Sequence, residues 1–122
     1  MTKENKELLL QDLCARLPYG VICDIYNEIS TIKEKLLFGG IAHFADDSIC
    51  VKPYLRTLAS MTDEERNEYN EYLFYGSSIG LVSNTVTAYE LIDWLNAHHF
   101  DYRGLIEKGL AIEVTENNNP YV

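Results

Sequence analysis

The residues best suited to chemistry in this chain lie close together near the end of an expected helix. They carry two imidazoles, an indole, a carboxylate, a phenol and a guanidinium: Trp94, His98, His99, Asp101, Tyr102 and Arg103. Imidazoles beside a carboxylate serve in both acid–base catalysis and zinc binding. Adjacent residues on a helix point about 100° apart, however, so His98 and His99 do not hold one ion from a regular helix. We therefore expect a binding corner here and no metal site.

No motif in the sequence predicts a catalytic centre. Two serines lie in GSSIGL, which lacks the spacing of a nucleophile elbow and the lysine of a phosphate-binding loop. We expect no catalytic residue and no cofactor. One alternative stays open, a small hydrolase or metal-binding protein that uses His43, His98 or His99.

Charge is distributed unevenly along the chain. The net charge is −9, and residues 61–122 carry eleven Asp or Glu but only three Lys or Arg. A surface of this sign repels phosphate groups, so direct nucleic-acid binding is not expected. It suits a basic protein partner, and the candidate contacts are three acids: Glu64, Glu65 and Glu68. A DNA-mimicking inhibitor is a second alternative, which requires the acids of 63–71 and 107–116 to form one row.

The composition indicates a protein of the cytoplasm. No apolar run approaches the roughly 20 residues that cross a bilayer. The N-terminal MTKENKELLLQDL interrupts its leucines with Gln and Asp and has no small-residue cleavage site, so it does not resemble a signal peptide. Cys14, Cys23 and Cys50 are widely spaced, and we expect buried free thiols.

The first half of the chain predicts one helix and a small sheet. Apolar residues at helical spacing indicate an amphipathic helix over 3–17 with a core-facing stripe of Leu10, Leu13, Cys14 and Leu17. Turn residues then separate short runs of β-branched and aromatic residues at 21–26, 29–37, 41–44 and 49–55. We interpret these runs as an antiparallel meander of three to four strands. Pro53 has no N–H to donate, so its strand is expected at a sheet edge or to end there.

The second half of the chain contains sequence signals for the N-termini of helices. Thr62 and Glu65 form a capping box, in which each side chain accepts the other residue's backbone N–H. Residues 79–85 favour a short strand or an ordered loop. A second capping box, at Thr87 and Glu90, predicts the start of the next helix.

The remaining residues complete a single α+β domain. Asp101 is placed to cap a short helix over 102–108, and Gly109 to end it in a left-handed conformation. The expected architecture is an N-terminal helix, a small β-meander, and two to three helices packed on it. We expect this domain to span 1–116 and the polar tail, 117–122, to fray.

Several segments of the chain resemble one group of proteins. These segments are LCARLPYGV (13–21), VKPYLR (51–56) with SMTDEE (60–65), and IDWLNAHHFDYRGLIEKGLA (92–111). They are similar to small uncharacterised proteins of gut Bacteroidales and their phages or prophages. The resemblance implies an origin in a mobile element and supplies no catalytic residue.

We therefore expect a non-catalytic accessory protein of phage or prophage type that acts by protein–protein contact. The acidic helix over 63–75 and the corner at 98–103 are the expected contact surfaces. The sequence specifies neither the partner nor the oligomeric state.

Overall fold

The computed structural model describes residues 2–37, 39, 41, 49–78 and 81–122, and within 74–78 and 81–87 it describes the backbone alone. The helices and strands are α1 (Lys3–Arg16), β1 (Ile22–Tyr26), β2 (Thr31–Lys35), β3 (Cys50–Leu55), α3 (Asp63–Ser78), α4 (Leu81–Ala97) and β4 (Ile112–Glu113). Short 3-10 turns follow α1 and β3, at Leu17–Tyr19 and Leu58–Ser60. The expected α+β class is confirmed. Of the expected strand at 41–44, residues 42–44 lie outside the described residues.

The four strands form a mixed sheet in the order β2-β1-β3-β4. β1 pairs antiparallel with β2 on one side and with β3 on the other, and β3 pairs parallel with β4. The sheet is therefore not a simple meander, because β3 lies beside β1 and the fourth strand comes from the C-terminal segment. The expectation that Pro53 marks an edge is wrong, since β3 is internal. β4 begins opposite Tyr54, so β3 acquires its second neighbour only after the proline.

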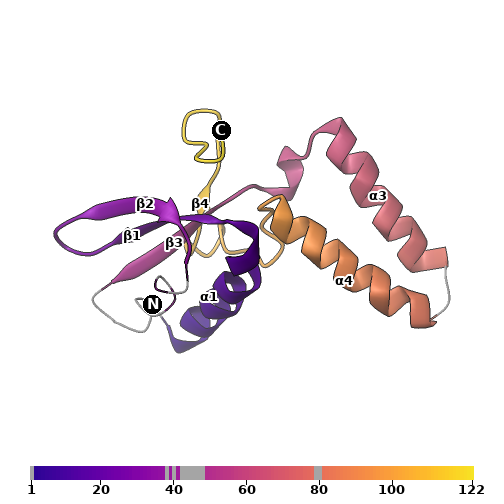
Figure 1. Cartoon of the computed structure of the whole chain (residues 1–122), viewed down its shortest axis with the longest axis horizontal. Helices are drawn as coiled ribbons and strands as arrows, with labels where there is room; N and C mark the ends of the chain where they lie inside the picture. The colour runs from indigo at the N-terminus through magenta and orange to yellow at the C-terminus, as the bar shows by residue number, and fades with distance from the viewer. Residues whose placement is uncertain (1, 38, 40, 42–48, 79–80) are drawn as a thin grey trace.

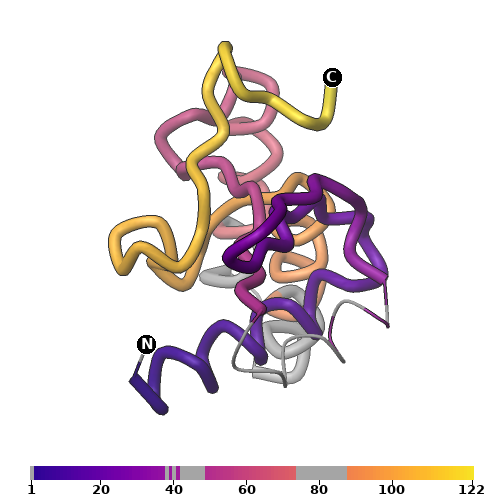
Figure 2. Tube along the Cα trace, turned by 90° about the vertical axis from the view of Figure 1, so that its left-hand side faces the viewer, coloured from indigo at the N-terminus to yellow at the C-terminus, as the bar shows by residue number. Residues whose placement is uncertain are grey.

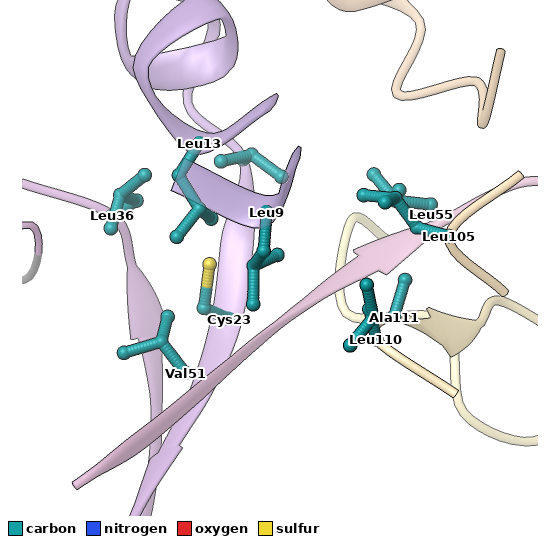
Figure 3. Packing of buried hydrophobic residues seen from close by; sticks show 10 residues of the cluster. Leu9, Leu13, Cys23, Leu36, Val51, Leu55, Leu105, Leu110 and Ala111 are labelled. Atoms are coloured by element: carbon teal, nitrogen blue, oxygen red, sulfur yellow. The ribbon is translucent and has the colours of Figure 1, made fainter. Parts of the chain in front are cut away.

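The hydrophobic core lies between α1 and one face of the sheet and continues to the C-terminal turn. Figure 3 shows Leu9 and Leu13 of α1 above Cys23, with the side chains of the C-terminal turn gathered near Leu55. The buried cluster consists of Leu9, Leu13, Val21, Cys23, Leu36, Val51, Leu55, Leu105, Leu110 and Ala111. Each fully buried leucine contributes roughly 1.5–3 kcal/mol, so this cluster is the main source of stability.

The core-facing stripe of α1 differs from the expected one. Leu10 is 38% exposed and Cys14 is exposed, whereas Asp12 and Arg16 are both fully buried. The prediction is wrong because the apolar pattern assigned the charged residues to solvent, and the protein buries them as a pair. Of the three cysteines, Cys23 alone is fully buried.

α3 and α4 form a helical hairpin that projects away from the sheet and α1 (Figure 1). The capping box at the start of α3 is confirmed. Thr62 Oγ1 accepts the Glu65 N–H at 3.1 Å, and Glu65 Oε1 accepts the Thr62 N–H at 2.9 Å. α4 begins at Leu81, so the expected helix start at Thr87 and the expected strand or loop over 81–85 are wrong. A Thr-x-x-Glu pattern marks a start only when the preceding chain is not helical.

The C-terminal segment, the residues that follow β4, runs away from α1 and returns to the sheet at Tyr121 (Figure 1). In the view of Figure 2, α1 (indigo) lies below β1 and β2, and the C-terminal segment (yellow) lies above them. The Tyr121 hydroxyl accepts the Ile22 N–H at 3.0 Å and donates to the Tyr54 carbonyl at 2.7 Å. The expectation of a frayed tail over 117–122 is therefore wrong at Tyr121, which bridges β1 and β3.

Candidate functional site

The corner that the sequence singles out joins α4 to the end of β3. The Arg56 N–H donates to the His99 carbonyl, and the Asp101 N–H donates to the Arg56 carbonyl, each at 2.8 Å. Arg56 and Phe100 form a parallel bridge. These bonds extend the pairing of β3 by one residue, so the corner attaches the α3–α4 hairpin to the sheet.

The turn that follows α4 contains a residue with an unusual backbone conformation. His99 has φ 62°, in the left-handed region that glycine normally occupies. The Phe100 N–H donates to Leu95 O at 2.9 Å and the His99 N–H to Asn96 O at 3.1 Å, which is a Schellman motif. A histidine in this conformation costs on the order of 1–2 kcal/mol, so other contacts must hold it there.

One such contact is the stack of His99 on Tyr121. The two rings lie 3.9 Å apart between centroids and 8° from parallel. His99 Nδ1 is buried and has no hydrogen-bond partner in the described part of the chain. Burial, together with the nearby charges of Arg16 and Arg56, lowers the pKa of His99 from 6.5 to about 4. His99 is therefore neutral at pH 7 and packs as an aromatic ring.

Trp94 and His98 belong to the packing between the two helices. The Trp94 ring lies 6.3 Å from that of Tyr69 and 6.2 Å from that of Tyr72, and its Nε1 donates to Glu68 at 3.0 Å. His98 Nδ1 lies 2.9 Å from the Trp94 carbonyl, and the two rings are 4.4 Å apart. Trp94 therefore holds α3 against α4, and His98 packs on Trp94 at the end of α4.

Asp101 caps the backbone of the turn that follows it. Its carboxylate accepts the N–H groups of Leu105 and Ile106, each at 3.0 Å. It caps this segment as expected, but the segment is a turn and not the helix expected over 102–108. The left-handed stop is confirmed, with φ 73° at Gly109 and the Leu110 N–H donating to Leu105 O at 2.9 Å.

Tyr102 and Arg103 surround a buried ion pair that sequence reasoning missed. Arg16 Nε lies 2.7 Å from Asp12 Oδ2, and Arg103 Nε lies 3.5 Å from Asp12 Oδ1. The Tyr102 ring centroid is 5.1 Å from each guanidinium carbon, and its hydroxyl donates to Asn96 at 2.8 Å. The only sequence signal was an acid and a base four residues apart, which is typical of exposed helix faces.

Among the three candidate acids of α3, two are engaged within the protein. The Arg56 guanidinium donates to both carboxylate oxygens of Glu65, at 2.8 and 2.7 Å. These hydrogen bonds lower the pKa of Glu65 from 4.5 to about 2. Glu68 accepts from Trp94, whereas Glu64 is exposed and has no such contact among those described.

A second polar cluster, also missed, lies on the sheet face away from α1. The Tyr54 hydroxyl is 2.9 Å from both oxygens of Asp24, and Lys33 Nζ lies 4.8 Å from the Tyr54 ring centroid. Burial and the bond to Asp24 raise the pKa of Tyr54. These side chains connect β1, β2 and β3 across the face.

The hairpin also carries apolar side chains that none of these contacts covers. On α4, Tyr89 is 68% exposed and Ile92 is 40% exposed, and on α3, Leu73 is 46% exposed. All three residues belong to the hairpin that projects from the sheet and α1 (Figure 1). The free surface of the hairpin is therefore both apolar and acidic.

The described residues contain neither a metal-binding cluster nor a membrane-spanning helix. Within those ranges, no group of three or more His, Cys, Asp or Glu is placed to hold a metal ion, and His43 lies outside them. No described helix is long and apolar enough to span a bilayer.

No family model, no curated protein and no solved structure matches this chain.

Proposed function

We propose that this protein is a non-catalytic accessory protein that binds a protein partner through the α3–α4 hairpin. The observation that carries the proposal is the exposure of Tyr89 and Ile92, at 68% and 40%, on a hairpin that projects from the rest of the fold (Figure 1). Exposed apolar side chains with acidic neighbours are common in interfaces whose rim is polar. The accessory role of phage or prophage type, and its place in the cytoplasm, are part of this proposal.

The proposed binding surface is the α3–α4 hairpin and not the corner. The side chains of the corner contact α3, the ion pair of α1, the C-terminal turn and Tyr121, so substitutions there are expected to act through stability. Glu65 and Glu68 are also engaged within the protein, because Glu65 accepts from Arg56 and Glu68 from Trp94. Glu64 remains a surface acid of the hairpin.

The two alternatives receive less support. A DNA mimic needs a row of free acids along 63–71, but Glu65 is paired with Arg56 and Glu68 accepts from Trp94. A histidine-dependent hydrolase needs an accessible imidazole, but His98 is packed on Trp94 and His99 on Tyr121.

Site-specific photocrosslinking in cells that carry the gene tests the proposal. A benzophenone amino acid replaces Tyr89 in one protein and the exposed Glu107 of the C-terminal turn in a control. We expect a discrete adduct from position 89, no adduct from position 107, and loss of the adduct when Ile92→Asp is added. The same adducts from both positions, or none from position 89, would contradict the proposal.

A further inference from the structure

The outer edge of β2 has no strand beside it in the described part of the chain. β2 is the first strand in the order β2-β1-β3-β4, and all of its residues are exposed. The Leu36 N–H, one residue after this strand, donates to the Val21 carbonyl at 2.8 Å, so Leu36 turns its backbone toward β1. Bonded and non-bonded pairs alternate in an antiparallel ladder, so the backbone groups of Thr31 and Lys33 turn toward the free edge.

An apolar row crosses the sheet and ends at this edge. Val51 of β3 lies opposite Ile25 of β1, and Ile25 lies opposite Ile32 of β2. The row is covered at Val51, which is 1% exposed, and open at Ile32, which is 54% exposed. Ile25, Ile32 and Ile49 also line one groove. The apolar surface of the sheet therefore extends to its free edge.

The two lysines of β2 are directed away from this edge. Lysine side chains commonly protect a free edge against pairing with another chain. The Lys33 ammonium instead lies 4.8 Å from the ring centroid of Tyr54, a residue of β3, so this side chain reaches inward across β1. The Lys35 side chain lies beside Gly20, which precedes β1. The edge is therefore left without the protection that lysines usually give.

Symmetry limits the ways in which two copies of β2 pair. Two antiparallel copies related by a twofold axis place one residue opposite itself. With the axis at Ile32, the two Ile32 side chains meet, and Thr31 of each copy exchanges backbone hydrogen bonds with Lys33 of the other. An axis at Lys33 or at Glu34 brings like charges together, and an axis at Thr31 places Glu34 opposite Glu28. The register centred on Ile32 therefore suits both the hydrogen bonds and the charges.

We propose that the free edge of β2 is a homodimer interface, in which two copies pair antiparallel about Ile32 and form one continuous sheet. This pairing joins the apolar rows of the two copies end to end. Residues 1–60 carry seven Lys or Arg and eight Asp or Glu, so the excess negative charge lies in the second half of the chain. The β1–β2 ribbon points away from the α3–α4 hairpin, which keeps the acidic helices of the two copies apart (Figure 1). The interface is separate from the surface assigned to the protein partner, and neither proposal depends on the other.

Analytical ultracentrifugation of the full chain, from about 5 µM to about 1 mM, tests the dimer. We expect the sedimentation coefficient to rise with concentration toward that of a dimer. Lys33→Pro removes the outward N–H without removing a bond to β1, and it is expected to weaken the dimer by at least about tenfold. Lys33→Ala retains this N–H, and Leu10→Lys changes an exposed leucine of α1; both controls are expected to leave the dissociation constant within about twofold. Circular dichroism of each variant shows whether the fold is retained.

A disulfide across the axis tests the register. In a chain that carries Cys14→Ser and Cys50→Ser, Ile32→Cys is expected to form an intermolecular disulfide under mild oxidation. The reason is that a non-hydrogen-bonded pair has its Cα atoms about 4.5 Å apart, within the range of a disulfide. Glu34→Cys lies on the same face but about 13 Å from its counterpart along the strands, so it is expected to stay reduced.

Three results would overturn the inference. The first is a wild-type chain that stays monomeric over the whole concentration range. The second is a dimer that Lys33→Pro leaves intact, or that Leu10→Lys abolishes, since either would place the self-association elsewhere on the molecule. The third is equal disulfide formation at positions 32 and 34, which would show random collision in place of the proposed register.

Discussion

Asp12 and Arg16 form an ion pair inside the core, with 2.7 Å between Oδ2 and Nε and neither side chain exposed. The Arg16 Nη2 also donates to the Phe100 carbonyl at 2.6 Å. One turn of α1 is thereby connected to the corner that attaches the helical hairpin to β3. The pair lies on the buried face of α1, with Leu9 and Leu13.

Removal of one member of this pair is expected to destabilise the folded protein. Arg16→Met leaves the Asp12 carboxylate buried beside Arg103 alone, and we expect a loss of about 3–5 kcal/mol in the free energy of unfolding. Glu7→Gln, on the exposed side of α1, is the control and is expected to change it by less than about 0.5 kcal/mol. Urea denaturation measures both. The double variant Asp12→Leu, Arg16→Met is expected to lose less than Arg16→Met, and a single-variant loss no larger than that of Glu7→Gln would contradict the structural role.

The Tyr121 hydroxyl is expected to stabilise the sheet. Tyr121→Phe retains the ring on His99 but leaves the Ile22 N–H and the Tyr54 carbonyl without this partner. We expect a loss of about 1–3 kcal/mol and faster amide exchange at Ile22. Deletion of Val122, which is fully exposed, is the control. Unchanged exchange at Ile22 in the Phe variant would refute the bridge.

Glu65 and Glu64 are adjacent acids, and their substitutions are expected to change stability by different amounts. Glu65→Gln weakens the pairing with Arg56 and is expected to cost about 1–3 kcal/mol at pH 7, whereas Glu64→Gln is expected to be nearly neutral. The pKa of Glu65 is lowered in the folded protein, from 4.5 to about 2. Its contribution is therefore present above pH 4.5 and is lost as the pH falls toward 2. Denaturation midpoints of wild type and Glu65→Gln should converge over this range, and equal effects of the two substitutions at pH 7 would argue against the pairing.

His99 is expected to make stability depend on pH in a different range. The folded pKa of about 4 lies below the ordinary 6.5, so the unfolded chain binds the proton first as the pH falls. Stability is therefore full well above pH 6.5 and declines as the pH falls toward 4, by less than the roughly 3 kcal/mol expected of a fully buried ring because His99 is partly exposed. His99→Asn tolerates the left-handed backbone, removes the titration and is expected to flatten this decline. His98→Gln retains His99 and should retain the decline; a flattened profile in that variant instead would assign the effect to His98.

The local features of the fold were predictable from the sequence. Strands β1, β2 and β3 and the capping box at Thr62 follow from side-chain types within a few residues, and all of them are present. Gly109 also ends its turn as expected, because a left-handed stop depends on one residue and its neighbours.

Features that depend on distant contacts were not predictable. Hydropathy assigns Asp12 and Arg16 to solvent, and only the approach of Phe100 and Arg103 makes their burial favourable. The strand that contains Pro53 is internal because a strand from residues 112–113 joins it beyond the proline. A local pattern contains no information about either event.

The corner illustrates the same limit for the candidate site. Its residues were chosen for their chemistry, and the structure does bring His98, His99, Asp101 and Tyr102 together. Their partners, however, are the helix terminus, Tyr121, the turn and Asn96, which the spacing of the six residues does not reveal. The sequence carried no prediction for Tyr89 and Ile92, because a local pattern does not show which side of a helix stays without a partner.

The bridge made by Tyr121 has a consequence for biosynthesis. It connects residues 99 positions apart, and β4 joins the sheet from residues 112–113. Ribosomes extend chains at about 5–20 residues per second, so β1 and β3 leave the exit tunnel seconds before the side chain that bridges them. During this interval the nascent sheet lacks its last strand and its bridge, while the α3–α4 hairpin, built from neighbouring residues, is able to form first. Folding during translation is therefore expected to finish only after residue 121 has emerged.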